Sequence, residues 1–438
     1  MGSTRARLCA ALAVAAVASL GITAFATGAG KAPAAKVGSG TASATKSVCG
    51  LGNGKKATGK PILLEGIFTL VPGIDFTTIG KIANDYFQCV NDNGGINGQR
   101  VVYKLYTEQL KPDAIAALAK KIVEQDHAVG VVGNTSLLDC AVNHKYYEAQ
   151  HLYVIVAGVP GECFETPNIA PVNMGPRYSA DGAVQTAILE GAKSIAFDQS
   201  NVPGTAYNLG GAKLIAAKHH VKITFLTENA ASINGSTAAE REIQAAGSDH
   251  GAVVLVFTPP VAQAILQGAQ HLGLENKVIW TCATPCNTDS LAKSLGPQWN
   301  HKLFTNAEMN DVHTDNGPDA TLFKQVIAQY GQAVKGGIGS FSQFGWTLGR
   351  LAVKALLSIK SHVYTAKTVN AAFKALKNYK TDMLCKPWYY GPLPNNTDYT
   401  VWPENGTMQI VPTSGCLPID PIDPEVAKAR AYEKAHGL

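Results

Sequence analysis

The sequence predicts an α/β protein with two Rossmann-like lobes, each a mainly parallel sheet flanked by helices. Three observations lead to this class. From residue 61 onward, short apolar runs alternate with segments of helical periodicity. The segment 90–100, VNDNGGINGQR, crowds three glycines and three asparagines between a helical and a strand-like stretch. A second alternating series begins near residue 177, and 438 residues with 46% hydrophobic content suffice for two domains.

The first strand–helix–strand unit surrounds that glycine-rich segment. Residues 62–68 form an apolar run of strand length, and the helix after it begins near Asp75 or Thr77. Its apolar positions are Ile79, Ile82, Ala83, Tyr86, Phe87 and Val90. Gly94 and Gly95 supply positive-φ residues that end a helix, and Asn97-Gly98 turns the chain into a strand at 100–106. A right-handed βαβ crossover is therefore expected.

The unit then repeats along the chain. A helix begins at Pro112 and Asp113, a buried strand follows at 128–133, and another lies at 151–158. The second series has strands at 193–198, 220–226, 251–257 and 276–280. After a run at 302–306, helices are expected at 320–330, 344–359 and 369–376. A final helix at 423–436 has no assigned role, and a solvated tail is one interpretation.

The N-terminus is typical of an export signal, with cleavage expected after residue 26. Arg5 and Arg7 precede an apolar run, and Ala24-Phe25-Ala26 offers the small residues that a signal peptidase accepts. An anchoring helix is the alternative, because the run is close to the shortest length that spans a bilayer. Cys9 comes too early to be the lipid-bearing cysteine of a lipoprotein signal, which follows the apolar run.

Residues 27–60 are rich in Ala, Gly, Ser, Thr and Lys and lack an apolar period, so a flexible linker is expected there. Residues 54–60 imitate the spacing of a phosphate-binding loop. Pro61, however, occupies the place of the magnesium-binding Ser or Thr, and the run precedes a strand where it should follow one. No nucleotide cofactor is therefore expected.

Export leaves eight cysteines, and an even number in an oxidising compartment favours disulfides. The pairs proposed from the sequence are Cys140–Cys163, Cys282–Cys286, Cys385–Cys416 and Cys49–Cys89, although sequence alone leaves the connectivity open. A zinc site lacks a second pair of ligands at finger-like spacing. A thioredoxin-like redox site requires two residues between its cysteines, not three. No metal is expected.

Charge and motifs exclude other classes of function. The net charge of +5 includes no basic run suited to nucleic acid. The sequence has no Gly-x-Ser-x-Gly elbow, no His-Glu-x-x-His helix and no nucleotide-binding glycine fingerprint, so an enzyme is disfavoured. The eleven histidines are scattered, and His219-His220 directly precedes a strand, where exposure is expected.

Four segments together resemble type I periplasmic binding proteins, the branched-chain amino-acid and amide receptors of ABC importers. They are ANDYFQCVNDNGGINGQRVVYKLY, KPDAIAALAKKIVEQDHAVGVVG, VLVFTPPVAQAILQGAQHLGL and FSQFGWTLGRLAVKALL. The Gly-Gly-Ile-x-Gly turn is moderately specific alone, and the ordered set is much more so. The resemblance extends over roughly residues 61–415.

This resemblance implies two lobes joined by three hinge crossings, with a ligand cleft between them. The crossings are expected near 174–180, 305–310 and 385–395. Lobe 1 would hold 61–176 and 308–388, lobe 2 would hold 177–307 and 389–420, and 421–438 would be a tail. A monomer in the extracellular space or cell envelope would close on a small molecule and deliver it to a membrane permease. A sensor module without a permease is the alternative.

Ligands of open α/β sheets lie beyond the carboxyl ends of strands, which selects candidate residues independently of the family. Loops after strands in lobe 1 supply Leu70, Val71, Asn134, Thr135, Ser136, Gly158 and Val159, whereas lobe 2 supplies Tyr207, Thr258, Pro260 and Thr284. The family resemblance adds Phe341 or Phe344 as a pocket wall. Thr135 and Ser136 are equally suited to capping the next helix, and the two phenylalanines to packing in the core.

One departure from the family concerns the ligand. Amino-acid receptors carry an acid after the strand that matches residues 276–280, where this chain reads TCATPCNTD and offers only Asp289, further along. An ammonium buried without a carboxylate is costly. The sequence therefore leaves a standard amino acid in doubt, and an apolar or amide-like solute is equally plausible.

Overall fold

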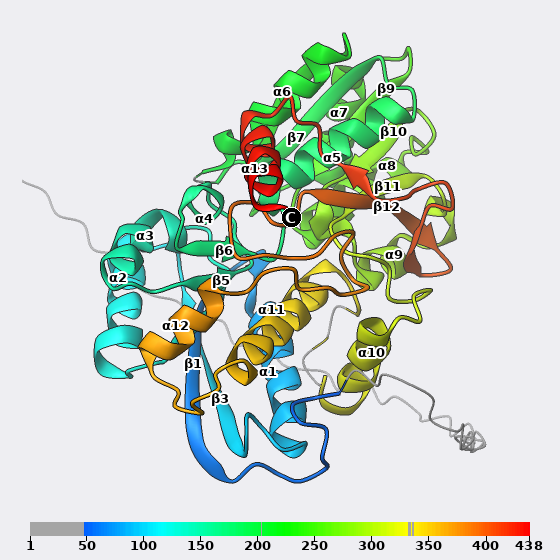
Figure 1. Ribbon diagram of the computed structural model, residues 1–438. Helices are drawn as coiled ribbons and strands as arrows, with labels where there is room; N and C mark the ends of the chain where they lie inside the picture. The colour runs from blue at the N-terminus through cyan, green and yellow to red at the C-terminus, as the bar shows by residue number, and fades with distance from the viewer. Residues whose placement is uncertain (1–47, 203, 332–333, 335–336) are drawn as a thin grey trace, which may run out of the picture. The chain divides into compact units, whose positions relative to one another are not determined.

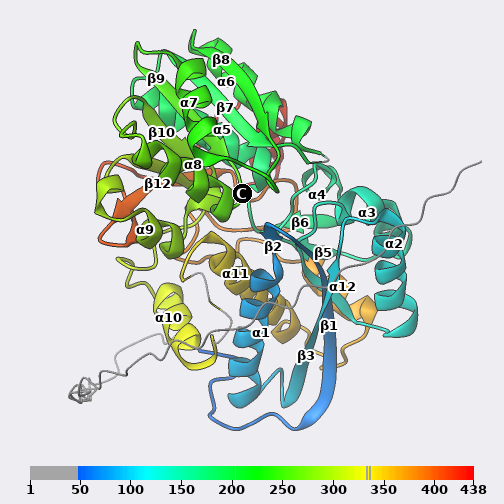
Figure 2. The ribbon, with the colours of Figure 1, turned by 180° about the vertical axis from the view of Figure 1, so that it is seen from behind.

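The computed structural model describes residues 48–202, 204–331, 334 and 337–438. The predicted signal peptide and most of the predicted linker lie outside these residues. The first sheet has the parallel order β3-β1-β4-β5-β6, and β2 pairs antiparallel with the end of β1. Figure 2 shows β1 and β3 side by side. The strand bounds are β1 Gly59–Val71, β2 Ile74–Asp75, β3 Gln99–Glu108, β4 Gly130–Asn134, β5 Val154–Val156 and β6 Ile169–Pro171.

Helices cover both faces of this sheet because its strands are apolar on both sides. Along β1, Leu64 and Phe68 belong to one buried cluster and Ile67 to the other. The first cluster includes residues of α1 (Thr77–Asp92), α10 (Pro318–Tyr330), α11 (Ser340–Leu357) and α12 (Ala366–Lys374). The second includes α2 (Pro112–Lys120), α3 (Asp139–Ala149) and α4 (Glu162–Glu165). A π-helical turn at Lys121–Gln125 continues α2.

The second sheet repeats this plan and adds antiparallel strands at one edge. Its parallel order is β8-β7-β9-β10-β11, and β12 joins β11 with β13 and β14 beside it. The strands are β7 Ser194–Ser200, β8 Lys222–Glu228, β9 Gly251–Val256, β10 Ile279–Cys282, β11 Leu303–Ala307, β12 Thr397–Glu404, β13 Thr407–Ile410 and β14 Leu417–Pro418. The helices are α5 Gly175–Leu189, α6 Leu209–Lys218, α7 Gly235–Ala246, α8 Pro259–His271 and α9 Asp289–Leu295.

The chain passes between the two sheets three times. It leaves the first sheet after β6, returns after β11 to build α10, α11 and α12, and leaves again before β12 (Figure 1). The predicted class, two α/β lobes with mainly parallel sheets, is confirmed. The sequence did not predict β6 or the four strands that pair antiparallel, which are β2, β12, β13 and β14.

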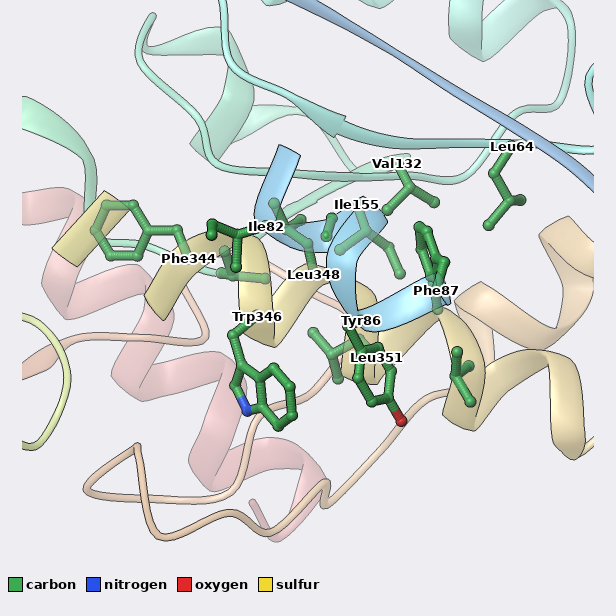
Figure 3. Packing of buried hydrophobic residues seen from close by; sticks show 14 of the residues in the cluster. Leu64, Ile82, Tyr86, Phe87, Val132, Ile155, Phe344, Trp346, Leu348 and Leu351 are labelled. Carbon is green, nitrogen blue, oxygen red and sulfur yellow. The ribbon is translucent and has the colours of Figure 1, made fainter. Parts of the chain in front are cut away.

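The core of the first lobe centres on the contact between α1 and α11. An added Cβ at Gly345 would lie 2.2 Å from the carbonyl oxygen of Ile79, so the two helices approach closely only with glycine there. Further along, the rings of Tyr86 and Trp346 lie 4.8 Å apart, edge to face (Figure 3). This packing fixes the start of α11, where Phe344 lies.

The glycine-rich segment turns as the sequence predicted. Gly94, Gly95, Asn97 and Gly98 all have positive φ, between 53° and 101°. At Gly95 an added Cβ would lie 2.1 Å from the carbonyl oxygen of Gln99, which excludes any side chain. The segment thereby returns the chain from α1 to β3 within a few residues.

The structure joins the eight cysteines in the four pairs proposed from the sequence: Cys49–Cys89, Cys140–Cys163, Cys282–Cys286 and Cys385–Cys416. The first pair fastens the segment before β1 to α1. The second joins α3 to α4 beneath the loop after β5. The third links the end of β10 to the turn directly after it, and the fourth links the segment before β12 to the segment before β14.

The C-terminal helix α13 (Pro424–His436) packs against the protein, which does not fit a solvated tail. Val426 and Ala429 are buried with residues of α4 and the loops near the crossings. Asp423, just before the helix, accepts hydrogen bonds of 2.7 and 3.1 Å from Arg177 on α5. Tyr432 stacks on Tyr389 with ring centroids 5.6 Å apart.

Element boundaries differ from the predicted ones where turns interrupt an apolar run. The strand predicted at 151–158 is only Val154–Val156, because His151, at φ 54°, ends the turn after α3. The helix predicted from residue 344 begins at Ser340. None of the helices in the described part of the chain combines the length and hydropathy that a bilayer span requires.

Candidate functional site

A cavity of about 130 Å³ lies where the carboxyl ends of both sheets meet. From the first sheet, it is lined by residues after β4, β5 and β6, namely Thr135, Leu137, Ala157, Gly158, Val159 and Asn173. From the second, residues at or after β7, β9, β10 and β11 contribute Ser200, Phe257, Thr258, Thr284 and Glu308. The position agrees with the general rule for ligand sites in open α/β sheets.

Aromatic rings form one wall of the cavity. Phe76 precedes α1, whereas Phe341 and Phe344 lie in the first two turns of α11. Phe76 and Phe341 meet edge to face with centroids 5.6 Å apart, and Phe341 lies 6.2 Å from Phe344. Because α1 and α11 are packed together, these rings form a preorganised apolar surface.

Hydrogen bonds hold the loop after β5 against the wall. The side chain of Asn173 accepts from the main-chain nitrogen of Gly158 at 2.7 Å and donates to its carbonyl at 2.9 Å. An added Cβ at Gly158 would lie 2.5 Å from Cβ of Cys163, so the disulfide leaves room only for glycine. This loop is therefore fixed before any ligand arrives.

A polar network forms the opposite wall. The hydroxyl of Thr284 donates to Oδ1 of Asn306 at 2.6 Å, and the hydroxyl of Ser179 donates to the same oxygen at 3.2 Å. The nitrogen of Asn306 donates in turn to the carboxyl group of Asp398. Burial raises the pKa of the Asp398 carboxyl well above its usual range, and the nearby Glu308 raises it further.

Glu308 is the one ionisable side chain among the described residues that line the cavity. Its Oε2 accepts a hydrogen bond from the main-chain nitrogen of Met174, at the start of α5, and its carboxyl group also bonds with Thr284. Burial raises the pKa of Glu308 from 4.5 to about 8, against the lowering effect of these two bonds. The cavity therefore holds a carboxyl group that is mainly protonated at neutral pH.

Seven residues selected from the sequence line the cavity: Thr135, Gly158, Val159, Thr258, Thr284, Phe341 and Phe344. Val71 and Pro260 line a second recess of about 370 Å³, which shares Ile74, Phe76, Thr258, Pro285 and Phe341 with the first. The hydroxyl of Thr258 donates to the carbonyl of Gly73 at 3.1 Å. Since Gly73 lies in the β1–β2 turn, this bond joins the two lobes at the edge of the cavity.

Four other candidates line neither space, each for a local reason. Leu70 pairs with Asp75 in the β1–β2 hairpin. Asn134 is buried and bonded to Ile67, Asp139 and Tyr147. Ser136 accepts from the nitrogens of Leu138 and Asp139 at the start of α3 and donates to Glu108, so its hydroxyl is bonded within this turn. Tyr207 directs its hydroxyl to Tyr178 at 3.0 Å.

The acid of the site is not the one that the sequence offered. Asp289 lines neither space, and its Oδ1 lies 2.9 Å from Nε2 of His313. Glu308 was missed, although it follows the predicted strand at 302–306 and the strand-end rule applies to it. Phe76 and Asn173 were missed as well, because each stands beside an element boundary that the sequence placed only roughly.

The described residues contain no group of three or more His, Cys, Asp or Glu side chains arranged to hold a metal ion. The polar atoms of the cavity wall are instead amides, hydroxyls and one carboxyl group. Such a wall can orient a small organic molecule by hydrogen bonds, while the aromatic face supplies apolar contact.

This fold and its strand-end cavity define a class of two-lobed binding protein. The chain belongs to the periplasmic binding protein family, whose model matches residues 76–398. The fold is the type I fold of that family, as the sequence predicted. No curated protein matches the chain.

Solved structures share the fold at low sequence identity. A branched-chain amino acid ABC transporter protein from Thermus thermophilus, with bound valine, is 15% identical with a TM-score of 0.71, covering 85% of this chain and all of that one. A fatty acid ABC transporter substrate-binding protein from Thermomonospora curvata is 13% identical (TM-score 0.70, 85% and 96% covered). An R. palustris solute-binding protein in complex with 4-hydroxybenzoate is 13% identical (TM-score 0.67, 82% and 98% covered).

Proposed function

We propose that the protein is an extracytoplasmic solute-binding protein of an ABC importer, which captures a small amino-acid-like, amide-like or apolar carboxylate ligand. The observation that carries this proposal is the cavity between the carboxyl ends of the two sheets, lined from both lobes. A solute there contacts Phe344 on one side and Thr284 on the other. Only the closed arrangement offers both sets of contacts, so binding favours closure.

The three passages between the sheets are proposed as the hinge. On this proposal lobe 1 comprises 61–176 and 308–388, and lobe 2 comprises 177–307 and 389–420. Closure would be absorbed by these few connecting residues while each sheet moves as a unit. The bond from Thr258 to Gly73 would form on closure and break on opening.

Family membership supports a place outside the cytoplasm, and four disulfides suit an oxidising compartment. On this proposal the mature protein acts as a monomer after removal of residues 1–26 and delivers its solute to a membrane permease. Structures of similar fold carry valine and 4-hydroxybenzoate, which supports a ligand of comparable size.

Thermal unfolding against a library of amino acids, amides and small aromatic compounds tests the proposal. A true ligand at about 100 times its Kd adds about 2.7 kcal/mol to the free energy of unfolding. Val159→Trp, which fills the cavity from its half-buried loop, should abolish this gain. Leu189→Trp is the matched control, because Leu189 is 68% exposed and lines neither the cavity nor the second recess. Absence of stabilisation by any small solute would count against the function.

A further inference from the structure

The position of Glu308 links the cavity to the hinge. Its side chain lines the cavity. Its Oε2 accepts a hydrogen bond from the main-chain nitrogen of Met174, which lies in the first passage between the sheets. Its main-chain carbonyl accepts a hydrogen bond of 3.0 Å from Asn395, in the third passage. Glu308 itself lies in the second passage, so all three passages meet at this residue.

Burial and hydrogen bonding act on the Glu308 carboxyl group in opposite directions. Glu308 is 2% exposed, and burial disfavours its ionised form. The main-chain nitrogen of Met174 donates to its Oε2, and this bond and the contact with Thr284 favour the ionised form. Burial is the larger effect, so the carboxyl group is held mainly in its neutral form.

The charges around the carboxyl group also favour its neutral form. Among the described lining residues no lysine, arginine or histidine is present. The titratable neighbour is Asp398 on β12, an acid that is itself buried. Burial raises the pKa of Glu308 to about 8, so the carboxyl group is mainly neutral at pH 7. The cavity then carries no formal charge.

We infer that the cavity selects an uncharged, largely apolar solute, and that Glu308 enforces this selection as a neutral carboxylic acid. The inference rests on the proposed function and narrows its ligand to the amide-like, uncharged class. A carboxylate ligand would find no cation in the lining. An ammonium ligand would require Glu308 to ionise, which places a buried charge beside Asp398.

Four probes that share a phenyl ring test this inference: acetophenone, benzoate, benzylamine and phenylalanine. At pH 7, acetophenone should raise the midpoint of thermal unfolding by about 2–4 °C at saturation, and the three charged probes should not. Binding of acetophenone should weaken about tenfold between pH 7 and pH 9, because a group with a pKa near 8 is then mostly ionised.

The substitution Glu308→Gln removes the ionisable group while keeping the size and shape of the side chain. Glutamine keeps the size of the side chain and can accept from Met174, but it cannot ionise, so the affinity of this variant for acetophenone should be the same at pH 7 and pH 9. Asp289→Asn is the matched control, an acid outside the cavity, and should keep the native pH profile.

The outcomes distinguish the inference from the proposed function. Stabilisation by benzylamine, benzoate or phenylalanine above that by acetophenone overturns the inference and leaves the proposed function intact. A loss of acetophenone affinity between pH 7 and pH 9 that is as large in Glu308→Gln as in the native protein also overturns it. If the wider solute library finds only charged ligands, the inference fails, and if it finds no ligand at all, the proposed function fails with it.

Discussion

The side-chain nitrogen of Asn395 donates a hydrogen bond of 3.0 Å to the main-chain carbonyl of Glu308. The same nitrogen donates to the carbonyl of Val172 at 3.3 Å. Val172, Glu308 and Asn395 each lie in a different passage between the two sheets, so one buried amide joins the three segments proposed as the hinge. Rigidity at this point would keep the three segments together while the lobes move.

Asn395→Ala tests the importance of this junction. Two carbonyl groups lose their donor at a site where Asn395 is 2% exposed, so the free energy of unfolding should fall by about 2–3 kcal/mol. Urea denaturation measures this. Asn229→Ala, at a solvent-exposed asparagine, should change stability by less than about 0.5 kcal/mol. Equal effects of the two substitutions would contradict the role of the junction.

The raised pKa of Glu308 predicts how stability depends on pH. In the folded state the Glu308 carboxyl group keeps its proton up to a pH of about 8, whereas in the unfolded chain it releases the proton near pH 4.5. Between pH 4.5 and pH 8 the folded state therefore binds more protons than the unfolded state. The contribution of Glu308 to the free energy of unfolding therefore falls as pH rises from 4.5 to 8. Relative to the native protein, Glu308→Gln should gain up to roughly 4–5 kcal/mol between pH 4.5 and pH 8.5.

Chemical denaturation of the native protein and of Glu308→Gln across this pH range measures the difference in their free energies of unfolding. Taking this difference cancels the contributions of the other buried acids, which both proteins share. Glu240→Gln, at an exposed glutamate, controls for the loss of one charge. A difference between native protein and Glu308→Gln that stays constant with pH would show that Glu308 is ionised in the folded state.

The hydrogen bond between Thr258 and Gly73 predicts that two substitutions of Thr258 change ligand affinity differently. Thr258→Val keeps the shape of the side chain and removes the donor to the carbonyl of Gly73. Affinity for a cavity ligand should fall about three- to tenfold, because the closed form loses about 1 kcal/mol. Thr258→Ser retains the hydroxyl and should bind within about twofold of the native protein. Calorimetric titration measures both, and equal weakening by the two substitutions would contradict a specific role of the hydroxyl in closure.

The ion pair between Arg177 and Asp423 predicts that α13 is part of the fold. Arg177→Met leaves the fully buried carboxylate of Asp423 without its partner and should cost about 3–5 kcal/mol. Lys193→Met breaks a pair with Asp249 in which both side chains are more than half exposed, and should cost less than about 1 kcal/mol. If chemical denaturation gives similar losses, the helix contributes little to stability.

The alternation of strands and helices was predictable because buried parallel strands and amphipathic helices leave strong periodic signals. The turn at Gly94 to Gly98 was predictable for a different reason, since positive φ demands glycine or asparagine. The antiparallel edge formed by β12 to β14 was not, because its strands alternate buried and half-buried residues among prolines and polar side chains.

The strand-end rule found about half of the candidate site. It selected Thr135, Thr258 and Thr284, which line the cavity, but could not tell that the hydroxyl of Ser136 is bonded to Glu108 and to the turn that begins α3. It also missed Glu308, whose environment depends on Met174 and Asn395, both far away in the sequence. A local pattern identifies the loop, whereas tertiary contacts decide which side chain of that loop faces the ligand.

A crystal structure of the protein with a bound solute tests the central claim most directly. We expect the solute between the two sheets, in contact with Phe344 from one lobe and Thr284 from the other, with Glu308 within hydrogen-bonding distance. A solute bound elsewhere on the protein, or held by residues of a single lobe, would contradict the account.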